Sequence, residues 1–140
     1  MIGTVTLSTS EIGRLDLRTS RAGDTATSQL QRTFDFHYRY QPARLALGRS
    51  LGVPTPPTPV DNFDGRAIRG ETLFGQGADD IGLWISLIIE HVGEPIADRR
   101  ALQELVAAHW ARGAGLLWDG LREASDPLAE LSVQILKDRR

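Results

Sequence analysis

The sequence predicts a mainly α-helical protein in which a short strand and two helices precede a compact helical bundle. Three observations indicate this: one short alternating segment near the N-terminus, a middle segment rich in glycine and proline, and a helical period through the second half. We place the strand–helix–helix unit at residues 4–47, the Gly/Pro-rich loop at 48–77 and the helical part at 78–140. With 140 residues, the chain is expected to form one domain over residues 1–140.

The first elements are predicted from alternation and capping. The segment Thr4–Leu7 alternates polar and apolar side chains, which is typical of a short, half-buried strand. Ser8 or Ser10 can accept a hydrogen bond from the first N–H groups of a helix that begins near Glu11. Gly23 is expected to end this helix, because glycine tolerates the left-handed backbone that commonly follows a helix.

Arginines dominate the positive charge of the N-terminal half. Fifteen of the sixteen basic residues are arginine, whose fork of donors can hold two phosphate oxygens at once. Residues 12–49 carry seven arginines against three aspartates, a local net charge of +4 in a chain with a formal net charge of −2. Arg14, Arg18 and Arg21 recur at i, i+4 and i+7, so we expect them to share one face of the first helix. Such a row is as typical of a solvated face as of a phosphate-binding surface.

A second helix is predicted from about Ala26, with Asp24 or Thr25 as its cap. Between residues 34 and 40, aromatic and polar residues alternate as in a strand, and a helix continuing from residue 26 is the competing interpretation. In the helical interpretation Pro42 ends the helix, because proline disfavours helical geometry in the residue before it. The periodicity does not distinguish between the strand and the helix. For the aromatic rings, core packing is favoured over stacking on nucleobases.

The composition of the middle segment predicts a loop, and the hydrophobic periodicity after it predicts helices. Residues 54–59 read Pro-Thr-Pro-Pro-Thr-Pro, which predicts an extended, stiff stretch that is either functional or a connection between two helical layers. A helix at 81–92 is apolar nearly all round, so we expect it to be buried in the domain or in an oligomer. Asp98 caps the next helix, and Asp126 with Pro127 starts the last one.

The residues that could support catalysis or bind metals form no recognisable constellation. The absence of cysteine excludes disulfides, iron–sulfur clusters, zinc thiolates and cysteine nucleophiles. The three histidines lack the spacing of zinc ligands, and His109 lies on an apolar stripe where a core or interface role is favoured. Asp79 and Asp80 fit the N-terminus of a helix better than a magnesium site. We therefore expect a protein without enzymatic activity, cofactor or metal. With no membrane-spanning run and no signal peptide in view, a cytoplasmic location is expected.

Short motifs distributed over most of the chain point to a family. They occur in one order: Leu15–Gly23 with Leu30-Gln31-Arg32, then Thr72–Gly75 leading to Trp84, then His109–Leu117. These segments resemble the first two helices, the middle and the histidine–arginine–glycine helix of the DndE family of DNA phosphorothioation proteins. The strand–helix–helix order also resembles the ribbon-helix-helix class of DNA-binding folds.

The resemblance implies an accessory protein of the bacterial system that replaces a non-bridging phosphate oxygen of DNA with sulfur. It further implies a compact helical protein that forms tetramers and binds nicked double-stranded DNA. The sulfur chemistry would belong to partner proteins: a cysteine desulfurase, an iron–sulfur sulfur-transfer protein and an ATPase. The family's basic cluster near the end of the first helix corresponds to Arg18 and Arg21, with Arg14 one turn earlier. With Arg32, these are the expected DNA-binding residues.

Two alternative functions remain open. A ribbon-helix-helix transcription regulator would present Thr4 and Thr6 from a paired strand to base edges, and would prefer one operator sequence. A non-DNA-binding scaffold of the modification complex would use the acidic C-terminal half to bind a basic partner. Strong operator preference would favour the first, and a tight protein complex without salt-dependent DNA binding would favour the second.

Overall fold

A computed structural model of the chain describes residues 7–137. Within that range the fold is mainly helical, with a single two-stranded antiparallel sheet, which confirms the predicted fold class. The elements in chain order are α1 (Thr9–Gly13), β1 (Asp16–Leu17), α2 (Arg21–Thr33), α3 (Tyr40–Leu51), β2 (Ile68–Arg69), α4 (Gly70–Leu73), α5 (Ala78–Val92), α6 (Arg99–Leu121) and α7 (Pro127–Lys137).

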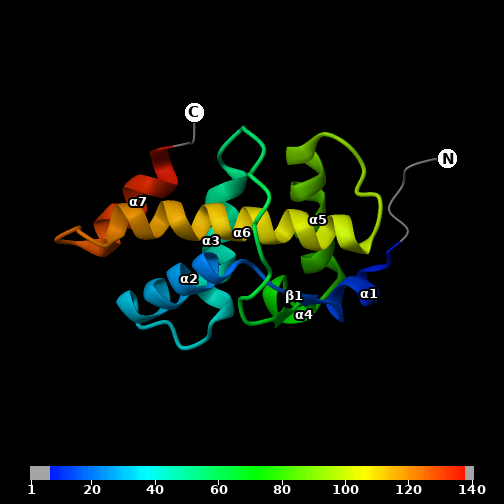
Figure 1. The fold of residues 1–140 in the computed structure, drawn as a ribbon, viewed down its shortest axis with the longest axis horizontal. Helices are drawn as coiled ribbons and strands as arrows, with labels where there is room; N and C mark the ends of the chain where they lie inside the picture. The colour runs from blue at the N-terminus through cyan, green and yellow to red at the C-terminus, as the bar shows by residue number, and fades with distance from the viewer. Residues whose placement is uncertain (1–6, 138–140) are drawn as a thin grey trace.

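Helix α6 is the central element, and it runs across the whole molecule in Figure 1 with α2 and α3 packed against it. Its buried side chains, Leu102, Val106, Trp110, Leu117 and Leu121, are at most 1% exposed and form the middle of the hydrophobic core. Polar groups fix α2 in place, since Trp110 Nε1 donates to Thr27 Oγ1 at 2.9 Å. The apolar stripe predicted for this helix is therefore the stripe that faces the core.

The predicted helix from Glu11 to Gly23 is wrong. Helix α1 ends at Gly13, and the chain then runs extended, because Leu17 is fully buried and pairs with Ile68 in the sheet. Helix α2 begins only at Arg21, where the Ser20 side chain accepts from the Gly23 backbone N–H and caps it. Gly23 is thus in the first turn of α2 and does not end a helix.

The predicted strand Thr4–Leu7 falls largely outside the described residues. The strand that precedes two helices is β1, which pairs Asp16 with Arg69 and Leu17 with Ile68. The predicted order of a short strand followed by two helices is therefore confirmed. The strand is β1 and the helices are α2 and α3, which lie later in the chain than predicted.

Residues 34–39 form neither the strand nor the continuous helix that the sequence left open. Helix α2 ends at Thr33, and a turn containing Asp35 at φ 56° leads into α3 at Tyr40. Pro42 does not end a helix but lies in the first turn of α3, where its missing N–H would have had no helical partner. The turn breaks the aromatic run between two helices. Phe34 and Tyr40 are partly buried and pack against the core, as the sequence favoured, whereas Tyr38 is exposed.

The last two helices, α6 and α7, begin at the capping residues that the sequence predicted. Asp98 Oδ1 accepts from Ala101 N at 2.9 Å at the start of α6, and Asp126 Oδ1 accepts from Ala129 N at 3.3 Å at the start of α7. Gly93 ends α5 with a left-handed backbone at φ 80°. Among the described residues, no helix combines the length and apolar character needed to cross a membrane.

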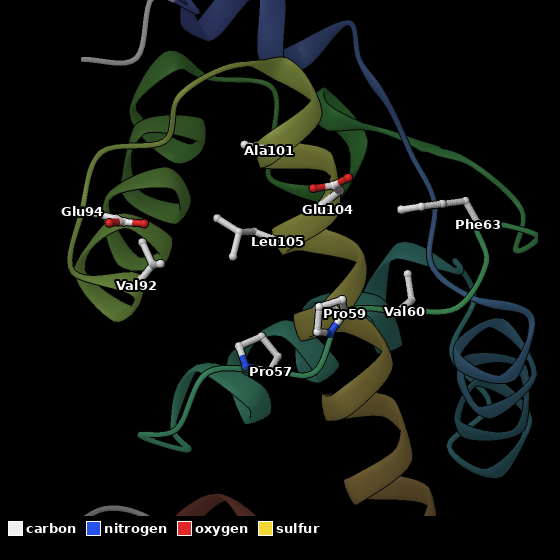
Figure 2. Close-up of a pocket in the computed structure, with 10 residues that line it drawn as sticks. Pro57, Pro59, Val60, Phe63, Val92, Glu94, Ala101, Glu104 and Leu105 are labelled. Atoms are coloured by element: carbon white, nitrogen blue, oxygen red, sulfur yellow. The ribbon is translucent and has the colours of Figure 1, made fainter. Parts of the chain in front are cut away.

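The Pro-rich segment lies over α6 and connects α3 to β2. Figure 2 shows Pro57, Pro59 and Val60 passing over this helix near Leu105. Together with Phe63 and the end of α5, they line a pocket of about 380 Å³. The segment is thus a connection across the helical layer, one of the two roles that its sequence allows.

Candidate nucleic-acid interface

The start of α2 is held by a loop segment that lies about 45 residues later in the chain. Gly65 N donates to Thr19 O at 3.0 Å, and Arg21 N donates to the Asn62 side-chain oxygen at 2.9 Å. The contact is tight, because a Cβ atom at Gly65 would lie 2.9 Å from Thr19 O. Residues 62–66 are therefore fixed against the first turn of α2.

This junction carries two of the predicted DNA-binding arginines. Arg18 Nη1 donates to Gly65 O at 2.9 Å, and Arg21 Nη2 lies 3.3 Å from Asp64 Oδ2. Both side chains are exposed, and that of Arg21 is 78% accessible. They are neighbours because the loop joins them and not because they share a helix face. The predicted row of Arg14, Arg18 and Arg21 on one helix does not exist.

The other two predicted arginines lie on different elements. Arg14 follows α1, and its Nη1 donates to Ser10 Oγ within the same short segment, so none of its hydrogen bonds reaches α2. Arg32 is exposed in the last turn of α2. It follows Arg21 by eleven residues, which places both on the same face of the helix, about 16 Å apart along its axis. The structure thus associates Arg18, Arg21 and Arg32 with α2 and leaves Arg14 apart.

Arg66 belongs to the same surface and was missed in the sequence. Its Nη2 donates to Ser28 Oγ at 3.1 Å, and Ser28 lies on the α2 face between Arg21 and Arg32. No local pattern singles out Arg66, because it reaches α2 only through the contact of the loop with the helix. We define the α2 arginine surface as Arg18, Arg21, Arg32 and Arg66.

Two carboxylates partly neutralise the positive charge of this surface. Asp64 pairs with Arg21, and Asp24 pairs with Arg39 and lies 3.7 Å from Arg66 Nε. The side chain of Arg39 is 15% exposed, and burial, followed by the nearby charge of Arg66, lowers its pKa to about 10. Arg39 therefore holds α2 to the start of α3. The guanidinium fork of an exposed arginine matches phosphate oxygens, so Asp64 and Asp24 are the groups with which a phosphate would compete at Arg21 and Arg66.

A second arginine network, also missed in the sequence, is partly buried where α3 and α6 meet the Pro-rich segment. Arg112 donates through Nε to Ser50 Oγ, and through Nη1 and Nη2 to the carbonyls of Thr55 and Ser50, at 2.7 to 2.8 Å. Burial, followed by the nearby charge of Arg49, lowers the pKa of Arg112. The network ties the end of α3 and the start of the Pro-rich segment to α6. Its position within the fold indicates a structural role.

His109 completes this network. Its Nδ1 lies 2.8 Å from Ser50 Oγ, and its ring meets that of His91 edge-on at 4.7 Å between centroids. The side chain is fully buried, and this burial lowers its pKa to about 4, with the charges of His91 and Arg112 as smaller causes. His109 is thus a neutral core residue at neutral pH, as predicted from the apolar stripe.

Comparison with known proteins identifies the family. The chain matches the family described as DNA sulphur modification protein DndE over residues 16–125. No curated protein and no solved structure matches it. The matched range runs from β1 past the end of α6, so it contains the whole α2 arginine surface and, except for Leu15, all of the motif segments that resemble the family. The chain therefore belongs to the DndE family, and its role lies in DNA sulphur modification.

Proposed function

We propose that this protein is a DNA-binding accessory component of DNA phosphorothioation, without catalysis of its own. It would bind the backbone of nicked double-stranded DNA without sequence preference. The observation that supports this most directly is the α2 arginine surface, where four exposed arginines from the segment between β1 and α2, from α2 itself and from the loop before β2 lie along one helix. Contacts from arginine to phosphate position a protein on DNA without reading its sequence. The preference for a nick is implied by the family.

Assembly would strengthen such binding. Helix α5 buries Ile81, Ile85 and Ile88 on one face, so it is not buried all round within the domain, and it exposes Leu83 and Leu87, which are 61% and 44% accessible. We infer that this face joins copies of the chain, in a tetramer according to the family resemblance. Several copies of the arginine surface on one DNA would raise the overall affinity through avidity. The sulfur-handling partners would be the cysteine desulfurase, the iron–sulfur protein and the ATPase.

The double variant Arg18→Ala/Arg21→Ala tests the assigned surface. Loss of two phosphate contacts should reduce the slope of log affinity against log salt by about 1.8 and weaken binding at least about ten-fold at low salt. The loss should be the same for unrelated DNA sequences. Binding is measured by fluorescence anisotropy on nicked and intact duplexes at several salt concentrations.

Arg122→Ala is the matched control, because Arg122 is an exposed arginine at the far end of α6 and its removal should leave the slope unchanged. Full affinity and an unaltered salt slope in the double variant would contradict the assignment. Absence of any salt-dependent DNA binding by the parent protein, together with a tight protein complex, would favour the scaffold function. Thr4 and Thr6, the base readers of the regulator alternative, lie outside the described residues.

Asp64→Asn should have the opposite effect and strengthen DNA binding. Asp64 pairs with Arg21 at the surface, so its carboxylate competes with phosphate for the same guanidinium. Surface pairs of this kind contribute up to about 1 kcal/mol, which corresponds to an affinity gain of about two- to five-fold at low salt. Asp119→Asn is the control, because it removes the same charge beside Arg122. Equal gains in both variants would show that only net charge matters.

A further inference from the structure

The aromatic turn between α2 and α3 borders a large groove. The groove has a volume of about 1090 Å³ and lies between α3, the end of α2, α5 and α7. Its lining includes four aromatic side chains and two arginines: Phe34, Phe36, Tyr40, Trp84, Arg44 and Arg49. We call this the aromatic groove. Several of its lining side chains, among them Phe34, Tyr40 and Trp84, pack against the core on their inner side, and the groove shares no residue with the α2 arginine surface.

The rings at its edge form a partly exposed cluster, in which the His37 ring meets the Tyr38 ring edge-on at 4.6 Å between centroids. Tyr38 is 55% exposed, and its ring lies almost parallel to that of Tyr40, at 14° and 5.6 Å between centroids. Arg44 Cζ lies 4.5 Å from the centroid of the Tyr40 ring. Arg44 is fixed there, because its Nε and Nη2 donate to the carbonyls of Leu73 and Thr72 at 2.7 and 3.1 Å. Planar rings and a positioned guanidinium thus occur side by side.

The charge of the groove restricts what it can hold. Among the described residues, the lining contains Arg44 and Arg49 and no carboxylate. Arg49 Nε donates to Gln134 Oε1 at 3.1 Å, so the positive charge considered for an occupant is that of Arg44. The pocket beneath the Pro-rich segment differs, since it is lined by Glu94 and Glu104. An occupant of the aromatic groove should therefore combine flat apolar surfaces with negative charge. Nucleobases joined by phosphates have this combination.

We propose that the aromatic groove, together with the Tyr38 ring that stacks on Tyr40 at its edge, binds unpaired nucleobases of DNA, with a base on Tyr38 and a neighbouring phosphate near Arg44. This inference rests on the proposed DNA-binding function and adds to it a second contact with a different chemistry. Bases inside an intact duplex are stacked on their neighbours, whereas bases at a strand break can unstack and expose their faces to a protein. The α2 arginine surface would hold the backbone, and the groove would distinguish a broken strand from a continuous one.

The test compares three labelled DNAs by anisotropy: an intact duplex, a nicked duplex, and a nicked duplex with a five-thymidine flap. The parent should bind the flap more tightly than the intact duplex. Tyr38→Ala should weaken flap binding at least about five-fold and leave the intact duplex unchanged, because stacking is lost. Tyr38→Phe keeps the ring and should bind like the parent. Tyr38 is half exposed, and thermal unfolding confirms that both variants fold.

The outcomes separate this inference from the proposed function. If Tyr38→Ala has no effect, or weakens all three DNAs alike, the inference is overturned, while Arg18→Ala/Arg21→Ala can still show backbone binding. If Tyr38→Phe loses as much as Tyr38→Ala, the hydroxyl and not the ring matters, and stacking is overturned. Equal parental affinity for flap and intact duplex also overturns it, and the groove would then fit a protein partner. If the parent binds no DNA, both proposals fail.

Discussion

Gly113→Ala should destabilise the protein by about 3 kcal/mol, because α3 and α6 touch through their backbones at this position. A Cβ atom on Gly113 would lie 1.7 Å from Ala46 O and 2.4 Å from Ala46 C. Backbone atoms cannot rotate away as a side chain can, so the two helices would have to move apart and open the centre of the core. Urea or thermal unfolding followed by circular dichroism measures the loss.

Gly115→Ala is the matched control, two residues further along the same helix. Nothing lies within 4 Å of a Cβ atom at Gly115, so alanine should stabilise α6 by about 0.5–1 kcal/mol through its better helix propensity. The two substitutions therefore have opposite expected signs. A Gly113→Ala variant as stable as the parent would show that α3 and α6 do not approach each other this closely.

The protein should lose about 3 kcal/mol of stability between pH 6.5 and pH 4 through His109 alone. Burial lowers the pKa of His109 from 6.5 to about 4 in the folded protein. Between these pH values the unfolded chain binds a proton at this residue and the folded chain does not. The stabilising contribution is therefore complete above about pH 6.5, and it is lost as the pH falls towards 4.

His109→Gln should remove this dependence, whatever its effect on stability at neutral pH. The measurement is the free energy of unfolding in urea at pH steps from 4 to 7.5, compared as slopes. His37→Gln is the control for the loss of a histidine, because His37 is exposed in the turn between α2 and α3. Parallel curves for the parent and the His109→Gln variant would contradict a neutral buried imidazole.

The elements that were predicted correctly are those whose signals are local. Asp98 and Asp126 cap helices within three residues of themselves, and the apolar stripe of α6 repeats along one helix. The first helix was predicted wrongly because Leu17 is buried by pairing with Ile68, 51 residues later. Its leucines and arginines suit a helix equally well. A contact so distant in sequence leaves no trace in local periodicity.

The candidate site likewise combines residues that the sequence could nominate with groupings that only the structure shows. Arg18 and Arg21 could be nominated from composition and resemblance, and their role in DNA binding stays a prediction. Their grouping with Arg66, and the separation of Arg14, depend on the loop that binds the start of α2. The exposure of Tyr38 depends on the turn that ends α2. Side chains of one type look alike in the sequence, and only packing decides which of them meet.

By itself, the sequence determined the mainly helical class, the helices α5 to α7, the buried His109 and the resemblance to the family, because caps, apolar stripes and short motifs are local properties of the chain. The tertiary structure decided which arginines share a surface, that Arg112 and Ser50 join the Pro-rich segment to α6, and that an aromatic groove opens beside α3. These features depend on contacts between segments separated by tens of residues. Such contacts form only when the hydrophobic core brings the helices together.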